Sequence, residues 1–470
     1  MITHALNNIY PLIFTGSKSY EINRRYVAAV TSIGGHYSEC ERLAAYLDLP
    51  VPFSTTTYQD HLQRIQPAVH AVAIESMKQA ASEAASKYDS TDIAVSVDGT
   101  WQRRGFSSKN GIVTVLSVMG KYEGSKVLDT ETLSTFCAGC TQLSNDNIKL
   151  STVANHKDTC RVNHKGSAGA MEACGAVSIF TRSEDVHSLR YTKYLGDGDS
   201  KAFKCVVDAD VYGGTQIEKI ECTGHIQKRM GKALMNAVED SKGKVFIINK
   251  DGNKLSKTVA NQSRGEKRVS GIAGAGKLTK DQIKRIQGHY GAAVRSHDNI
   301  SDMRKAIWDI FHHRRGDHSE CPSWCASHDQ DLEKANKHKL PPYICDIIKP
   351  VFERLSSDDL LSKCTHGGTQ NANEAFHHII WQRVPKEKFC GTQRLKLGVD
   401  MATLSFNDGE RGVAAAFGAL GLPITSNQWQ YAVQFDANRV KNANRAVTEG
   451  KKSQRQKQSI DKSAYDGGAF

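Results

Sequence analysis

The sequence contains no apolar run that approaches the roughly 18 residues of a membrane helix. Its longest candidate, Gly412–Ile424, is short and is interrupted by glycine and proline. The first residues, Met1–Phe14, lack the basic flank and the small-residue cleavage site of a secretory signal. Internal repeats are also absent. We therefore expect an intracellular protein that has no membrane partner.

Disulfide frameworks are rare inside cells, so the twelve cysteines favour metal sites or buried thiols. Hydrophobic residues make up 39% of the 470 residues, which is enough for a buried core. The net charge is +12 at pH 7. A basic surplus of this kind is typical of proteins that bind nucleic acid, although it also fits a basic solvated surface.

Three acidic residues lie in recognisable settings. Asp98 ends the apolar run Ile93–Val97, Asp197 follows the run Arg190–Gly196, and Glu374 lies in a helical pattern. Two carboxylates at strand ends and one on a helix can converge on two Mg²⁺ or Mn²⁺ ions, which prefer oxygen ligands. Such a pair of ions can hold both the attacking and the leaving oxygen when a phosphodiester is cleaved. Asp199 competes with Asp197, which we favour because it is nearer the strand. Each residue alone is more typical of a turn or an exposed helix.

The order of the predicted elements indicates an α/β fold with a ribonuclease H-like mixed sheet. Three strands are followed by helix, strand, helix, strand and helix, and in that fold the first and fourth strands are neighbours. Asp98 would then lie beside Asp197. The predicted strands are 92–102, 111–120, 126–135, 190–195 and 216–221, and the helices are 166–180, 200–211 and 226–240.

The chain divides into five predicted regions. They are an N-terminal helical region, 1–90; the ribonuclease H-like core, 91–245, with a zinc-type loop at 136–165; a linker and helical insertion, 246–365; C-terminal helices that carry the third acidic residue, 366–435; and a basic tail, 436–470, that we expect to be flexible. Within the first region, Ser54–Thr57 would cap a helix from Tyr58 to about Ala85.

Two Cys/His clusters have spacings that suit zinc. Structural Zn²⁺ is held by four soft ligands in a closed tetrahedron. The stronger cluster consists of Cys137, Cys140, His156 and Cys160, with His164 as a possible substitute. The weaker cluster consists of His318, Cys321, Cys325 and His328; its fourth ligand is open because His312 and His313 are near. The alternative in each case is a set of unrelated loop residues.

Three further motifs are weaker. Cys222 and His225 form a Cys-x2-His pair at a predicted helix start, which suits either a polar pair beside the acidic site or a buried thiol and a helix cap. Arg103 and Arg104 follow Trp101 and can hold a DNA phosphate, but a core tryptophan with solvated arginines fits equally. Gly271–Lys277 nearly forms a phosphate-binding loop, but Leu278 replaces the required Ser or Thr, so we reject ATP binding.

Several blocks together resemble the Mutator-like transposases, in particular an animal group with an Asp-Gly-Thr-Trp-Gln-Arg-Arg-Gly block. The matching blocks, spread over most of the chain from residue 20 onward, are Asn23–Arg25, Asp98–Gly105, Asn163–Glu172, Tyr194–Lys201, Glu221–Met230, His366–Glu374, Ser405–Gly409 and Gly467–Phe470. The family often carries more sequence, including a cysteine-rich segment, before the Asn-Arg-Arg block, where this chain has only Met1–Ile22.

The resemblance implies an Asp-Asp-Glu (DDE) triad on a ribonuclease H-like core, a helical insertion before the glutamate, and a Cys-x2-His motif between the second aspartate and the glutamate. Carried over, the triad is Asp98, Asp197 and Glu374, and the pair is Cys222 and His225. The implied activity is metal-dependent cleavage and strand transfer of a DNA transposon by a nuclear homo-oligomer that binds transposon ends and target as double-stranded DNA. Two alternatives stay open: a transposon-derived DNA-binding protein without catalysis, and a ribonuclease H-like nuclease without strand transfer.

Overall fold

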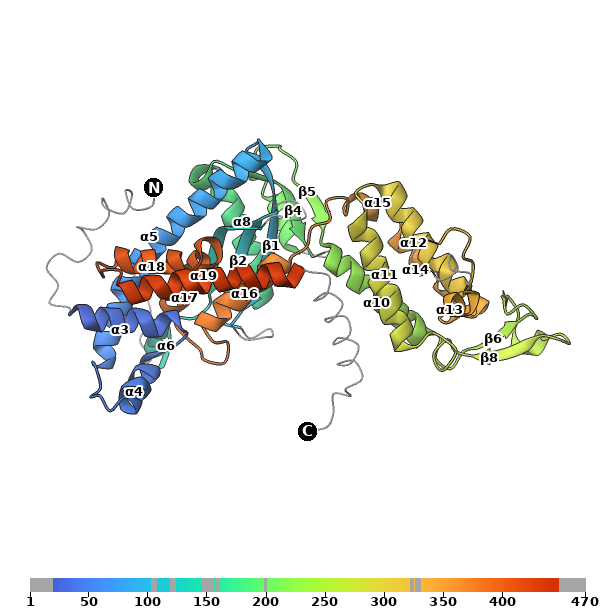
Figure 1. Cartoon of the computed structure of the whole chain (residues 1–470), viewed down its shortest axis with the longest axis horizontal. Helices are drawn as coiled ribbons and strands as arrows, with labels where there is room; N and C mark the ends of the chain where they lie inside the picture. Colours follow the sequence, from blue (N-terminus) through green and yellow to red (C-terminus); the bar gives the residue numbers. More distant parts are fainter. Residues whose placement is uncertain are drawn as a thin grey trace.

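The computed structural model describes residues 20–102, 108–118, 124–145, 156, 160–197, 201–321, 325 and 331–447. They form two lobes (Figure 1). The core lobe contains a five-stranded mixed sheet and the helices from both ends of the described chain. The insertion lobe follows the last strand of this sheet and is mostly helical.

The large sheet has the strand order β3-β2-β1-β4-β5. β1 pairs antiparallel with β2 and parallel with β4, while β4 pairs parallel with β5. The predicted adjacency of the first and fourth strands is therefore confirmed. The strands are β1 (Asp92–Trp101), β2 (Asn110–Ser117), β3 (Val127–Ser134), β4 (Arg190–Gly196) and β5 (Glu218–Glu221).

Alternation along β1 and β2 divides the sheet's side chains between two helical layers. Val95 and Val113 pack with α8 (Ala168–His187) and α9 (Lys201–Asp208). Ile112 and Leu116, on the opposite face of β2, pack with α16 (Asn371–Arg383) and α17 (Thr392–Asp408). The sheet is covered on both faces, and one covering layer comes from residues far along the chain.

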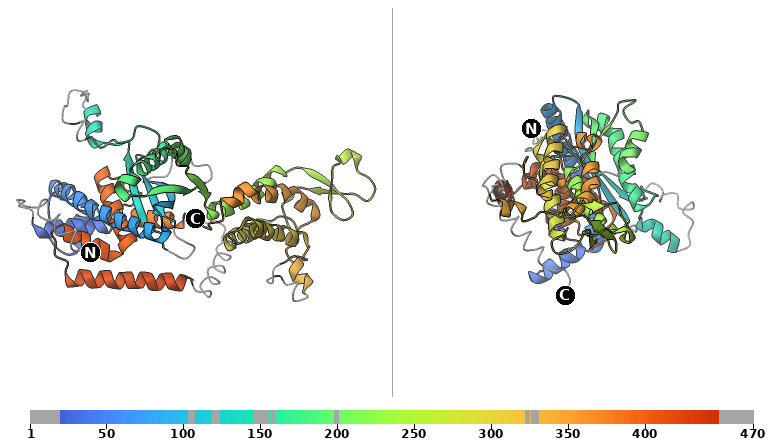
Figure 2. Two further views of the ribbon diagram at one scale, coloured as in Figure 1. Left: turned by 90° about the horizontal axis from the view of Figure 1, so that it is seen from above. Right: turned by 90° about the vertical axis from the view of Figure 1, so that its right-hand side faces the viewer.

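The N-terminal helices share one core with α17 and α18. Ser54 caps α5 by accepting a hydrogen bond from the backbone N–H of Thr57, as predicted, and α5 then packs along α17. The apolar face of α5 and the apolar face of α17 bury each other, and this burial stabilises both helices. The helices of this core are α3 (Glu21–Ser32), α4 (Tyr37–Tyr46), α5 (Thr55–Tyr88), α17 and α18 (Glu410–Ala419). The long helix α19 (Ser426–Val447) lies along the outside of the core lobe (Figure 2).

The insertion lobe has its own apolar core, centred on residues such as Tyr290, Phe311 and Phe352. Its helices are α10 (Thr223–Asp240), α11 (Lys280–Ser296), α12 (Ile300–Arg315), α13 (Leu332–Asn336), α14 (Pro342–Leu355) and α15 (Asp358–Ser362). A small sheet of order β7-β6-β8 was not predicted, because β8 is charged rather than alternately apolar. Its strands are β6 (Val245–Ile248), β7 (Lys254–Leu255) and β8 (Lys267–Ser270), with a short helix, η2 (Val259–Asn261), between the last two.

The chain leaves the core lobe and returns to it through neighbouring segments. The backbone N–H of Glu221 donates to the carbonyl of Lys363 at 2.8 Å, and that of Thr223 donates to Gly368 at 3.1 Å. The two connections therefore meet beside the end of β5. None of the helices in the described part of the chain combines the length and apolar character needed to cross a membrane.

Candidate active site and metal centres

The first two acidic residues lie at the same edge of the large sheet. β1 and β4 run parallel, and Ser96 of β1 pairs with Leu195 of β4. Asp98 and Asp197 each follow two residues later, so they reach equivalent positions on adjacent strands. Asp199 lies outside the described residues, and the choice between it and Asp197 stays a prediction.

Asp98 is partly buried, with 32% of its side chain exposed, and it faces the helix that carries Glu374. Its Oδ1 accepts a hydrogen bond from the backbone N–H of Gly99, and its Oδ2 lies 3.6 Å from Nδ1 of His377. Burial, followed by the negative charge of Glu172, raises the pKa of Asp98 to about 7. A bound cation would stabilise the ionised form of this carboxyl, because its positive charge offsets the free energy that burial adds to a carboxylate.

The start of α16 is fixed to the sheet by polar side chains on one helical face. Gln370 donates to the carbonyl of Val97 at 2.8 Å, and the fully buried Asn373 donates to the carbonyl of Ser96 at 3.3 Å. His377, one turn later, hydrogen bonds Thr114 through Nε2 at 2.9 Å. Glu374 is exposed in the first turn, next to Asn373, and its charge contributes to the raised pKa of Asp98. These contacts hold the helix that carries the third acidic residue against the strand that carries the first.

Glu172 is a fourth carboxylate in this region that the sequence interpretation did not assign. It lies in the first turns of α8, and its Cγ would be only 3.0 Å from a Cβ added to Gly99. Burial and the charge of Asp197 raise the pKa of Glu172. A Cβ at this position would be tight against both Glu172 and Trp101, and these neighbours would have to shift by a few tenths of an ångström. A signal was available, because Glu172 ends one of the blocks that carry the family resemblance.

Cys222 and His225 flank the same edge of the sheet. Cys222 is buried at the N-cap of α10 and accepts a hydrogen bond from the backbone N–H of Gln370 at 3.4 Å. His225 lies in the first turn of α10, and its Nδ1 is 3.9 Å from Oδ1 of Asp197. A hydrogen bond with Cys222 raises the pKa of His225. Arg229 lies 4.0 Å from the same oxygen and 3.0 Å from Glu221. The pair thus links Asp197 to the segment that leads into α16.

Within the described residues, the triad is not one of the groups whose ligand atoms all lie within 4.8 Å of one another. The three carboxylates share a region but do not converge as closely as metal ligands. Like charges at close range repel each other unless a cation lies between them. Three hard oxygen donors at one sheet edge fit Mg²⁺ or Mn²⁺ in their chemistry.

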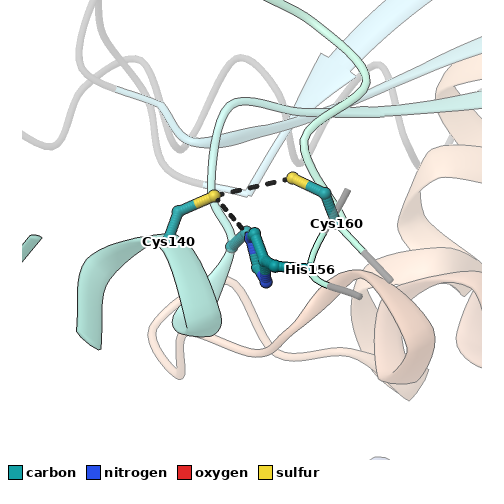
Figure 3. Close-up of side chains that lie close together, drawn as sticks. Cys140, His156 and Cys160 are labelled. Carbon is teal, nitrogen blue, oxygen red and sulfur yellow. Dashed lines mark hydrogen bonds between the residues drawn. The ribbon is translucent and has the colours of Figure 1, made fainter. Parts of the chain in front are cut away.

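The first Cys/His cluster does converge closely. Sγ of Cys140 lies 3.0 Å from Nε2 of His156 and 3.5 Å from Sγ of Cys160 (Figure 3). Sγ of Cys137 lies 3.9 Å from the same nitrogen. Ligand atoms of a tetrahedral zinc site lie about 3.3–3.8 Å apart, as bond lengths of about 2.0–2.3 Å require. The cluster can therefore hold a structural metal such as zinc. It joins α6 (Ala138–Asn145), which follows β3, to the segment before α8. His164 instead hydrogen bonds the carbonyl of Ser167.

The second cluster gathers His313, His318, Cys321 and Cys325 at the end of α12. Sγ of Cys325 lies 3.6 Å from Nδ1 of each histidine. Burial, followed by the charge of Arg314, lowers the pKa of His313 to about 4, so its imidazole is neutral, the form that binds a metal. His328 lies outside the described residues, and the predicted role of that residue is untested. His313 supplies the fourth donor that the spacing left open.

The structure describes only some of the residues in the remaining motifs. Trp101 packs against the core beside α8 and donates through Nε1 to the carbonyl of Ala168 at 2.9 Å, which is a structural role. Arg103 and Arg104 lie outside the described residues, and their predicted contact with DNA is untested. In the glycine-rich segment, Nζ of Lys277 donates to the carbonyl of Ser270 at 2.6 Å.

Comparison with known families decides the broader assignment. The model of the Mutator-like transposase family matches residues 7–325 of the chain. The chain belongs to the Mutator-like transposase family. The predicted resemblance is therefore confirmed. No curated protein shows significant similarity to the chain.

The family match covers the strands that carry Asp98 and Asp197, the Cys-x2-His pair, and both Cys/His clusters. It ends before α16, so Glu374 lies beyond the matched range. The position of Glu374 follows instead from the contacts that Gln370, Asn373 and His377 make with the sheet. Membership of a transposase family implies that the partner is DNA.

Proposed function

We propose that this protein is a DDE-type transposase that cleaves phosphodiester bonds and transfers strands of a DNA transposon. The observation that carries the proposal is the parallel register of β1 and β4, which sets Asp98 beside Asp197 at the edge where α16 begins. The sheet order, three antiparallel strands followed by two parallel ones, supports a ribonuclease H-like core. Family membership supports the class of reaction.

Asp98, Asp197 and Glu374 would hold the divalent cations. Bound there, Mg²⁺ or Mn²⁺ supplies a more acidic water and neutralises charge on the phosphate oxygens. Water then attacks phosphorus at the transposon end, and the broken P–O bond leaves a 3′-hydroxyl and a 5′-phosphate. That 3′-hydroxyl attacks a target phosphodiester, joining the element to the target and releasing a new 3′-hydroxyl.

The surrounding residues have positioning roles in this proposal. His377, held by Thr114, fixes the orientation of the Asp98 carboxylate without adding charge, because burial lowers its pKa to about 3. Arg229, between Glu221 and Asp197, presents a cation where a DNA phosphate would enter. Action on two transposon ends favours a homo-oligomer, and the DNA substrate favours the nucleus.

The test is nicking of supercoiled plasmid by the purified full chain with Mg²⁺ or Mn²⁺, comparing the natural sequence with Asp98→Asn and Glu374→Gln. Nicking that disappears in both variants, and that requires the cation, is the expected result. Joined products made with transposon-end DNA separate a transposase from a nuclease that only cuts. A folded protein that binds DNA but cuts no better than its variants would instead indicate a DNA-binding descendant of a transposon.

A further inference from the structure

A strongly basic segment forms the small sheet of the insertion lobe. Residues 242–280 contain ten Lys or Arg and two Asp or Glu, a net charge of +8 out of +12 for the whole chain. We call this segment the basic finger. It forms the tip of the molecule farthest from the large sheet (Figures 1 and 2). Its exposed basic residues are Lys242, Lys244, Lys250, Lys254, Lys257, Arg264, Lys267, Arg268 and Lys280.

The basic finger is fixed to the helices beneath it. Phe246 and Val269, which are opposite each other on β6 and β8, pack against the core of the insertion lobe. The ring of Phe246 lies 6.3 Å from that of Tyr343 on α14. Tyr343 also donates hydrogen bonds to the carbonyls of Gly252 and Gly271. The charges are thus presented from an anchored sheet, which lowers the entropy lost on binding a ligand.

Most of the positive charge in the finger is not neutralised within the described structure. Glu266 lies 2.7 Å from Lys257, and Asp251 hydrogen bonds Asn249. Four other basic residues make no ion pair with a carboxylate of the described residues; they are Lys244, Lys250, Arg264 and Lys267. Crowded like charges repel one another, and a polyanion relieves this repulsion while releasing its own counterions.

The composition of the finger also indicates the form of the nucleic acid. Proteins that bind single strands place aromatic rings where the bases can stack on them. Phe246 is the one aromatic residue in segment 242–280, and it packs against Tyr343. Nζ of Lys254 lies 5.5 Å from the centre of the Phe246 ring. The other lysine and arginine side chains of the finger have no further aromatic residue in the segment to pack on, and they suit the phosphates of a duplex.

We propose that the basic finger binds the sugar–phosphate backbone of double-stranded DNA at a distance from the carboxylates of the core lobe. The proposal rests on the proposed function, since it assigns a surface to the DNA substrate. It also separates two tasks: the core lobe cleaves, and the finger holds flanking duplex independently of its sequence. The finger would therefore contribute to affinity through salt-sensitive contacts rather than to the choice of the cleaved bond.

The experiment measures binding of the full chain to a fluorescent 30-base-pair duplex, without added Mg²⁺ or Mn²⁺, over a series of NaCl concentrations. The finger variant carries Lys244→Gln, Lys250→Gln, Arg264→Gln and Lys267→Gln. The control variant removes the same charge from exposed residues of the core lobe and α19, by Arg42→Gln, Lys78→Gln, Lys396→Gln and Lys441→Gln. Each lost phosphate contact lowers the slope of log K against log salt by about 0.9.

The finger variant is expected to lose about 2–4 units of this slope and at least about tenfold in affinity at 100 mM salt, while the control loses less than about one unit. Equal slopes for the two variants would overturn the proposal. So would binding of polyglutamate as tight as binding of the duplex, because the surface would then recognise acidic peptides. If the fourfold variant is less stable by thermal unfolding, Lys250→Gln alone should still lower the slope by about 0.9.

The two proposals fail separately. No Mg²⁺ or Mn²⁺ is added, so binding in this assay does not depend on cleavage. Finger-dependent binding by a protein that never nicks plasmid would disprove the proposed function and leave the finger intact. Metal-dependent nicking together with a finger variant that binds DNA normally would disprove the DNA-binding role of the finger, while the proposed transposase function would stand.

Discussion

Asp98 and His377 face each other across the contact between β1 and α16, with Nδ1 of the histidine 3.6 Å from Oδ2 of the aspartate. The other ring nitrogen of His377 hydrogen bonds Thr114 on the neighbouring strand. Burial lowers the pKa of His377 to about 3, so the ring is neutral at physiological pH. Asp98 therefore has an uncharged neighbour on α16, which leaves its negative charge available to a cation.

Cation binding should weaken as the pH falls through 7. The pKa of Asp98 is raised to about 7 by burial and by Glu172, and a protonated carboxyl cannot ligate a metal. Mn²⁺ affinity, measured by calorimetry, should fall about tenfold between pH 8 and pH 6 and should release close to one proton at pH 6. In Asp98→Asn the remaining affinity should depend much less on pH. A natural protein with constant affinity over this range would contradict the expectation.

Glu172 should contribute to cation binding. Its stem packs against Gly99 and its carboxyl is buried near Asp98 and Asp197. Glu172→Gln should lower Mn²⁺ affinity and plasmid nicking at least about tenfold, as expected when a carboxylate close to a metal is lost. Asp185→Asn, on the exposed side of α8, is the matched control and should change neither quantity. Unchanged Mn²⁺ affinity in Glu172→Gln would remove this residue from the site.

Asn373 should matter more for stability than its neighbour Asn371. The buried amide of Asn373 donates to carbonyls on both β1 and β2, whereas Asn371 is exposed. Asn373→Ala removes these buried side-chain hydrogen bonds and should cost about 1–3 kcal/mol of unfolding free energy. Asn371→Ala should cost less than about 0.5 kcal/mol. Denaturant unfolding monitored by circular dichroism measures both, and equal losses would contradict the docking role of Asn373.

The purified protein should contain two zinc ions per chain. Each Cys/His cluster supplies four donors within 4.8 Å of one another. Cys140→Ser and Cys325→Ser should each leave one zinc ion, and Cys174→Ser, at an exposed free thiol of α8, should leave both. Metal analysis by mass spectrometry gives the count. A natural protein with fewer than one zinc ion, purified without chelators, would show that the clusters are not metal centres.

The sequence predicts the large sheet well, because β1, β2 and β4 are rich in apolar residues and are followed by Gly, Asp or Ser residues that favour turns. It does not predict β8, whose Lys267 and Arg268 break the expected alternation and whose strand is held by pairing with β6. Asp98 and Asp197 stand out locally, since strand ends are visible in the pattern. Glu172 does not, because its importance depends on how closely α8 crosses β1 at Gly99.

The candidate Zn²⁺ ligands show a similar division. The spacing of Cys137 and Cys140 is a local pattern that brings two donors together within one helical turn. His313, in contrast, lies inside α12, and it meets Cys321 and Cys325 because the chain reverses after that helix. Side chains joined by a chain reversal are fixed by packing, which the spacing alone does not specify.

The meeting of the two connections near Thr223 and Gly368 has a consequence for the order of synthesis. These residues are 145 positions apart in sequence but hydrogen bonded in the fold. Glu374 cannot reach Asp98 until the whole insertion lobe has been translated and has folded back, and α17, which completes the core with α5, is translated later still. A nascent chain that has not yet released α16 and α17 therefore lacks the assembled carboxylates. The proposed DDE site would therefore form only after these C-terminal helices have been made, and any DNA cleavage would have to follow that step.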